Sequence, residues 1–172
     1  MNEFVLTCCS TADLPKERFE QLKVSYVCFN YTIDGVTHPD DLGQSIPFDE
    51  FYRRMAEGAM TSTSQVNMDQ YLQFFEPFLA EGKDVLHVTL SSGISGSFNS
   101  ACAAAQVLRE KYPERKLYIV DSLGASSGYG LIIDKMAELR DSGMNIDALH
   151  GWVEEHKLNT VSYTHLTLPT KR

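Results

Sequence analysis

The sequence predicts an α/β fold in which a parallel sheet of about four strands is flanked by helices. The main observation is that short apolar runs typical of strands alternate with helical patterns, which favours parallel pairing through right-handed crossovers. The length of 172 residues suits one domain with a compact core. A composition of 43% hydrophobic and 22% charged residues is that of an ordinary globular protein.

The first part of the chain contains two strand-like runs and one helical pattern. Residues 3–9 form a short apolar run and are expected to be a strand. A helix is expected over residues 15–22, because Pro15 suits the first helical position. Residues 24–33 are rich in β-branched and aromatic side chains and are expected to form a single second strand, which ends at the turn signal Asp34–Gly35.

The next part is expected to consist of loops and helices. Two polar segments, residues 38–46 and 59–66, are interpreted as loops on either side of a helix, which is expected between Pro47 near its start and Gly58 past its end. A third helix is expected over residues 68–82, with Asn67 as its N-cap. Pro77 lies inside that helix and is expected to kink or split it, because proline removes a backbone hydrogen bond.

The second half repeats the alternation more regularly. Residues 83–90 and 116–122 are apolar runs expected to be buried strands, and each precedes a helical pattern. These helices are expected over residues 99–112 and 126–143, followed by a last helix over residues 145–157 with Asn145 as its N-cap. Strand–helix alternation of this kind is the signature of a parallel sheet.

The C-terminal end does not follow the pattern. Residues 161–172 have no clear periodicity, and we interpret them as a non-native tail of linker or adapter origin. The alternative is a native C-terminal tail. We therefore expect residues 1–160 to form one α/β lobe, with the last twelve residues outside it.

Charge and composition exclude several classes of function. A net charge of −8 without any basic run argues against nucleic-acid binding. No apolar run approaches the roughly 18 residues of a membrane helix, and the start lacks the basic region of a signal peptide. The four cysteines show no C-x-x-C spacing, so we expect no metal site and reduced thiols in a cytoplasmic protein.

Hydroxyl side chains gather at the points where strands are expected to give way to helices. Because the carboxyl ends of parallel strands meet at one edge of a sheet, we expect these groups to lie near one another. They comprise Ser10 and Thr11; Ser91, Ser92, Ser95 and Ser97; Ser122, Ser126 and Ser127; and Thr61, Ser62, Thr63 and Ser64.

These turns carry hydroxyls but no lysine or arginine. Hydroxyls and free amides at a helix N-terminus can bind a small anion, and one carboxylate can be held without a cation. A phosphate-transfer site would usually bring a cation or metal ligands. The alternative is that Ser95, Ser97 and Asn99 only cap a helix and turn a corner, and the residues alone leave both interpretations open.

A serine esterase is a further alternative. Residues 93–97 begin like the nucleophile elbow G-x-S-x-G, with Ser95 as the nucleophile, but serine replaces the last glycine. A triad also needs a histidine at the same edge. His87 lies in an expected strand and is interpreted as a core residue, while His150 and His156 lie on the last helix. A domain that binds no ligand and serves only for interaction is a third alternative.

Four segments together resemble the DegV family, whose members bind fatty acids. The segments are "CSTADLP" at residues 9–15, "TSQV" at 63–66, "LSSGISGSFNSA" at 90–101 and "VDSLGASSGYGLI" at 120–132. They occur in the order of the family's motifs. The resemblance implies a two-lobed α/β protein, of which these residues would be the N-terminal lobe with the second lobe missing.

The resemblance also implies a function. Thr63 and Ser95 would hold the carboxylate of a long-chain fatty acid, with Ser64 and Ser92 as neighbours. The protein would be a carrier, without catalysis or a cofactor of its own, that presents the acyl chain to a separate fatty acid kinase. The kinase would form an acyl-phosphate for phospholipid synthesis. With no transmembrane segment expected, such a carrier could make transient contact with a membrane surface.

Overall fold

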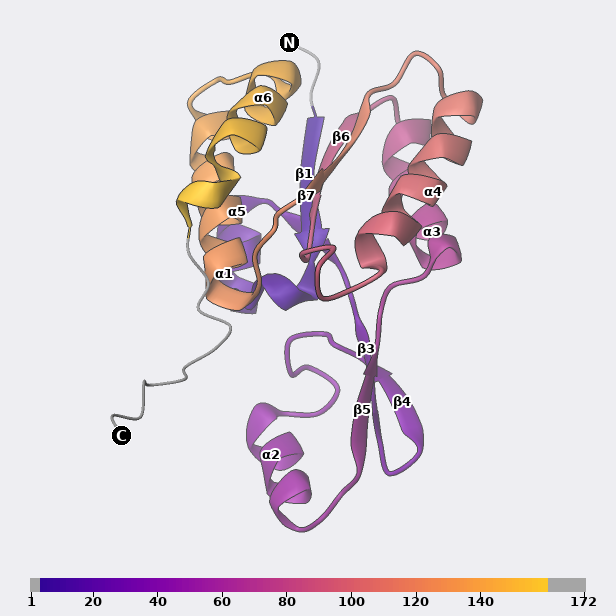
Figure 1. Cartoon of the computed structure of the whole chain (residues 1–172), viewed down its shortest axis with the longest axis vertical. Helices are drawn as coiled ribbons and strands as arrows, with labels where there is room; N and C mark the ends of the chain where they lie inside the picture. Colours follow the sequence, from indigo (N-terminus) through magenta and orange to yellow (C-terminus); the bar gives the residue numbers. More distant parts are fainter. Residues whose placement is uncertain (1–3, 161–172) are drawn as a thin grey trace, which may run out of the picture.

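The computed structural model describes residues 4–160 and contains two sheets (Figure 1). The larger sheet has four parallel strands in the order β2-β1-β6-β7, which confirms the predicted fold class. Its strands are β1 (Phe4–Cys9), β2 (Ser25–Val27), β6 (Asp84–Thr89) and β7 (Leu117–Asp121). The segment expected to be a non-native tail, residues 161–172, lies outside the described residues, so that interpretation stays a prediction.

Helices cover both faces of the parallel sheet, as Figure 1 shows. One face carries α1 (Lys16–Leu22), α5 (Ser126–Asp141) and α6 (Ile146–His156), and the other carries α3 (Met68–Ala80) and α4 (Ser97–Lys111). All six residues of β6 are buried, as expected for a strand between two helical layers. No helix within residues 4–160 is both long and apolar enough to cross a membrane.

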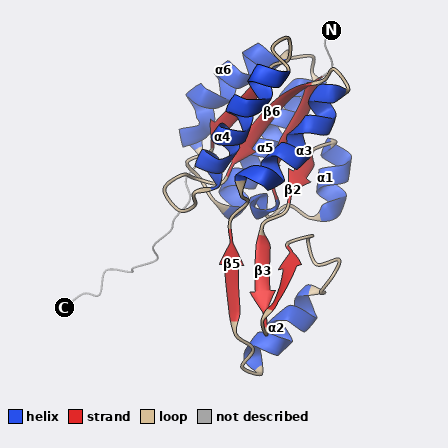
Figure 2. Cartoon of the chain, turned by 90° about the vertical axis from the view of Figure 1, so that its right-hand side faces the viewer, coloured by secondary structure: helices blue, strands red, loops and turns tan. Residues whose placement is uncertain are grey.

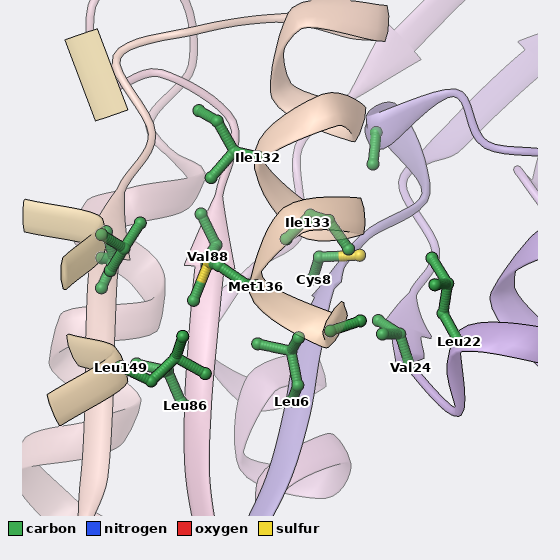
Figure 3. Close-up of a cluster of buried hydrophobic side chains, with 14 of the residues drawn as sticks. Leu6, Cys8, Leu22, Val24, Leu86, Val88, Ile132, Ile133, Met136 and Leu149 are labelled. Carbon is green, nitrogen blue, oxygen red and sulfur yellow. The ribbon is translucent and has the colours of Figure 1, made fainter. Parts of the chain in front are cut away.

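The core on the α5 side is built from sheet and helix residues that are far apart in sequence (Figure 3). Leu6 of β1 and Val88 of β6 pack against Ile133 and Met136 of α5, with Leu149 of α6 beside them. Alternation along β1 sends Cys8 to this core and Cys9 to the one under α3 and α4. The sheet therefore separates two apolar cores.

The expectation of one strand over residues 24–33 is wrong. The segment divides into β2, in the parallel sheet, and β3 (Asn30–Ile33), in the second sheet. The division lies at Phe29, whose backbone N–H donates to the buried Ser10 hydroxyl at 3.1 Å and so leaves the ladder of β1. Asp34 and Gly35, with φ of 51° and 79°, then form a tight hairpin turn into β4 (Val36–Pro39).

The hydroxyl-rich segment expected to be a loop also contains a strand. β5 (Thr61–Ser64) pairs antiparallel with β3, and Tyr31 lies opposite Thr63. Its serines and threonines show no apolar alternation, so only the pairing with β3 identifies it. We call residues 30–64, which include α2 (Phe48–Ala56), the arm. Figures 1 and 2 show the arm projecting from the carboxyl end of the parallel sheet.

Of the two outcomes expected at Pro77, a kink or a split, the split is wrong, because helix α3 is continuous from Met68 to Ala80. Proline at this place removes one hydrogen bond in the last turn, and the rest of the helix is retained. The predicted cap at Asn67 is confirmed, because its side chain accepts from the Gln70 backbone N–H at 2.9 Å. The Gln70 side chain in turn accepts from the Asn67 backbone N–H at 3.0 Å, completing a capping box.

Candidate functional site

A pocket of about 570 Å³ lies where the arm meets the carboxyl edge of the parallel sheet. Four segments line it: the turn after β1, the arm, the residues that follow β5, and the turn between β6 and α4. The lining residues are Thr11, Phe29, Asn30, Tyr31, Asp40, Gly43, Ile46, Phe48, Phe51, Tyr52, Thr63, Ser64, Gln65, Leu90, Ile94, Ser95 and Gly96.

Three of the four predicted carboxylate-binding residues come together in this pocket. Thr63 and Ser64 reach it from β5, and Ser95 reaches it from the β6–α4 turn. Ser92 is exposed and does not line the pocket, and its backbone N–H donates to Asp121 Oδ1 at 3.1 Å. Thr11 in η1 (Ser10–Ala12), one of the turns that the sequence singled out, also lines the pocket.

The apolar wall of the pocket comes from the arm. Ile46, Phe48, Phe51 and Tyr52 lie in or just before α2, and the Phe51 ring meets Tyr31 edge-on at 5.2 Å between centroids. Sequence reasoning did not assign these residues to the site, because it did not recognise the β3–β4 hairpin. The Asp-Gly pair after an apolar run is a hairpin signal that could have identified it.

The hydroxyl of Ser95 is oriented by its own turn. The backbone N–H of Ser97 donates to Ser95 Oγ at 3.2 Å, and the Ser95 N–H donates to the Ser91 carbonyl at 3.1 Å. The Ser95 oxygen therefore acts as an acceptor within the turn, which leaves its O–H proton for an acceptor in the pocket. Since the described lining contains no lysine, arginine or histidine, an anion here would be held by hydroxyls and amides.

The turn that carries Ser95 lies directly against the segment that carries Thr63. A Cβ atom added to Gly96 would meet the Gln65 side-chain oxygen at 2.5 Å. The Gln65 amide thus occupies the space that any larger residue at position 96 would need. This close approach brings the hydroxyls of the two segments to one pocket.

Two lining residues, Thr11 and Asp40, carry polar groups that are wholly or partly withdrawn from solvent. Thr11 Oγ1 is inaccessible to solvent and has no hydrogen-bond partner within residues 4–160. Burial raises the pKa of the nearby pocket residue Asp40, although a hydrogen bond from Ser10 works in the opposite direction. A bound anion would be repelled by the Asp40 carboxylate whenever that group is ionised, whereas the Thr63 and Ser95 hydroxyls could donate hydrogen bonds to it.

The interpretation of His87 as a core residue is confirmed. The residue is wholly buried in β6, and burial lowers its pKa to about 3. Its ring nitrogens face Thr7 Oγ1 at 2.9 Å and Cys9 Sγ at 3.8 Å. Within residues 4–160 no hydrogen bond joins Ser95 to a histidine, and no group of acidic, histidine or cysteine side chains could hold a metal ion.

A second hollow, of about 600 Å³, lies at the opposite, amino-terminal edge of the parallel sheet. Charged side chains dominate it, among them Lys23, Lys116 and Arg140, and the Lys116 ammonium is paired with the Asp147 carboxylate. An apolar chain would gain little burial there, whereas the first pocket offers an aromatic wall.

The chain is similar to known proteins over most of its length. A family model described as an uncharacterised protein of the DegV family matches residues 5–167. A DegV domain-containing protein from Clostridium perfringens is 36% identical over 163 residues, which cover 95% of this chain and 56% of the relative.

Solved structures of proteins that bind fatty acids have the same fold as this chain. A stearic acid-binding protein from Eubacterium ventriosum has 27% identity and a TM-score of 0.79, over 88% of this chain and 52% of that one. The Streptococcus pneumoniae fatty acid kinase B3 protein, loaded with linoleic acid, shares the fold at 22% identity and a TM-score of 0.72, over 92% and 55% of the two chains. The chain thus spans about half the length of its relatives. The match of the family model to nearly all of its residues shows that the chain belongs to the DegV family.

Proposed function

We propose that this protein is a carrier that binds a long-chain fatty acid in the pocket between the arm and the parallel sheet. Thr63 and Ser95 would hold the carboxylate, with Ser64 beside them and Ser92 as an outer neighbour. The observation that carries the proposal is the joining of hydroxyls from two segments with an aromatic wall around one pocket. The stearic acid bound by the Eubacterium ventriosum relative supports the choice of ligand.

The two parts of the pocket would contribute differently to binding. Burial of each methylene on the wall formed by Phe48, Phe51 and Tyr52 is worth about 0.8 kcal/mol, so the acyl tail would supply most of the affinity. A hydrogen bond to a charged group is worth roughly 1.5–3 kcal/mol. The hydroxyls would therefore fix the orientation of the ligand, and each would add the free energy of about one hydrogen bond to binding.

The carboxylate contact gives a direct test. Thr63→Val and Ser95→Ala are each expected to weaken fatty acid binding about tenfold or more, because each removes a hydrogen bond to the carboxylate. Affinity for palmitate would be measured by calorimetry, with urea unfolding to show that each variant is folded. The matched control is Ser62→Ala, since Ser62 is exposed in the same strand and does not line the pocket.

The outcomes separate the alternatives. Unchanged affinity in both variants would remove Thr63 and Ser95 from the site, and an absence of binding by the unaltered chain would favour an interaction domain. Hydrolysis of a chromogenic ester that disappears in Ser95→Ala would favour an esterase. Ser92→Ala in the same titration decides the role of Ser92, and a smaller loss is expected there because Ser92 lies outside the pocket.

We further propose that the bound fatty acid is presented, in the cytoplasm, to a fatty acid kinase. The kinase would transfer the γ-phosphoryl group of ATP to a carboxylate oxygen, releasing ADP and leaving an acyl-phosphate for phospholipid synthesis. With palmitate, a purified fatty acid kinase, Mg-ATP and hydroxylamine, we expect palmitoyl hydroxamate to form, with release of ADP and phosphate, only when this protein is present. Equal formation without this protein would contradict the carrier role.

A further inference from the structure

A continuous chain of buried polar contacts runs from the middle of the parallel sheet to the pocket. His87 Nε2 lies 3.8 Å from Cys9 Sγ, and Cys9 Sγ lies 3.3 Å from the Tyr71 hydroxyl. The Tyr71 hydroxyl lies 2.6 Å from the Ser97 hydroxyl. All four side chains have no solvent exposure. The last of them, Ser97, donates its backbone N–H to the pocket residue Ser95.

The Tyr71–Ser97 contact joins the starts of two helices. Tyr71 lies in the first turn of α3, which follows the segment that carries Thr63. Ser97 is the first residue of α4, which follows the turn that carries Ser95. One hydrogen bond therefore ties together the two chain segments whose hydroxyls line the pocket.

The two helix starts differ in how they are stabilised locally. The capping box of Asn67 and Gln70 holds the first turn of α3. At the start of α4, Gly96 supplies no side-chain cap, and Ser95 Oγ accepts from the Ser97 N–H instead. The position of the Ser95 oxygen thus depends on where Ser97 is held, and Tyr71 holds the Ser97 side chain from the better-anchored helix.

We propose that Tyr71 is a positioning residue that acts through Ser97 to aim the Ser95 hydroxyl into the pocket. The inference rests on the proposed function in one respect, namely that Ser95 contacts the ligand carboxylate. Tyr71 itself does not line the pocket and would not touch the fatty acid. Its hydroxyl also contacts Cys9 of β1. Tyr71 would therefore fix the position of Ser95 relative to the sheet as well as to α3.

The test is a double-mutant cycle on palmitate affinity with Tyr71→Phe and Ser95→Ala. Tyr71→Phe keeps the ring and removes only the hydroxyl, and it is expected to weaken binding about threefold to tenfold. In the Ser95→Ala background the same change should have little further effect, because the residue through which it acts is gone. Ser97→Ala removes the other end of the same hydrogen bond and should weaken binding to a similar degree.

Tyr129→Phe is the matched control. Tyr129 is also wholly buried, and its hydroxyl accepts from the Cys9 backbone N–H at 3.0 Å and donates to the Val88 carbonyl. Tyr129→Phe should lower the free energy of unfolding and leave the affinity for palmitate unchanged. If Tyr71→Phe behaves in the same way, or if its effect on affinity persists fully in Ser95→Ala, the positioning role is wrong.

A second measurement needs no ligand. In Tyr71→Phe, the hydrogen exchange rate of the Ser97 amide should rise about tenfold or more. In Tyr129→Phe, this rate should change only as much as the loss of global stability accounts for. Protection of the Ser97 amide that is the same in both variants overturns the inference. If the unaltered protein binds no palmitate, the proposed function fails, and the exchange measurement still decides whether Tyr71 holds Ser97.

Discussion

Acidification from neutral pH to pH 4.5 is expected to destabilise the protein by roughly 2.7 kcal/mol through His87 alone. Burial lowers the pKa of this histidine from 6.5 to about 3 in the folded protein. Between these two values the unfolded chain binds a proton that the folded protein does not. Stability therefore falls as the pH falls below 6.5, by about 1.4 kcal/mol for each pH unit, and the slope ends near pH 3.

The physical reason is that the interior around His87 suits only the neutral ring. Aromatic rings of Tyr71 and Phe75 lie against it edge-on at 5.3 Å and 4.9 Å between centroids, and its nitrogens face Thr7 and Cys9. Thr7 and Cys9 are uncharged polar partners, so they do little to offset the cost of a buried positive charge.

The measurement is urea unfolding between pH 7.5 and pH 4.5 for the unaltered protein and His87→Gln. Glutamine stays neutral over this range and can still form hydrogen bonds, so its variant should lose the share of the pH dependence that comes from His87. The carboxyl groups of the protein contribute to both profiles and cancel in the difference. Parallel profiles for the two proteins would contradict the prediction.

Gly130→Ala is expected to destabilise the protein by roughly 2–3 kcal/mol, near the upper end for overpacking of a core. Gly130 of α5 packs on η1, and a Cβ atom there would lie well under 3.0 Å from the Ala12 carbonyl oxygen. It would also meet Leu14 Cδ2 at 3.1 Å. The Ala12 carbonyl oxygen belongs to the backbone and cannot rotate away, so α5 and η1 must move apart. Movement of η1 would also displace Thr11, which lines the pocket.

Gly151→Ala is the matched control in α6. A Cβ atom at this exposed position meets nothing within 4 Å, and alanine is favoured over glycine in a helix interior by about 0.5–1 kcal/mol. The same substitution should thus lower the free energy of unfolding at position 130 and raise it at position 151. Equal changes at the two positions, measured by urea unfolding, would show that the contact with Ala12 carries no cost.

The sequence by itself determined the features that depend on local pattern. The apolar run of β6 and its neighbours was enough to predict a parallel sheet between helices, because strands buried on both faces leave no polar alternation. The caps at Asn67 and Asn145 were also predictable, since a cap is a contact between neighbours in the chain; Asn145 Oδ1 accepts from the Ala148 N–H at 3.0 Å. The order of its motifs predicted the family, which the match to residues 5–167 confirms.

Only the tertiary structure decided how the pocket is built. β5 has the composition of a loop and is a strand because β3 lies beside it, and the arm that β3 begins supplies the aromatic wall. The same geometry separates Ser95, which lines the pocket, from Ser92, which does not, although they are three residues apart in one motif. Tyr71 and Ser97 are 26 residues apart and meet only after α3 and α4 pack together. A residue pattern records the preferences of neighbours along the chain, whereas these contacts depend on which distant surfaces pack against each other.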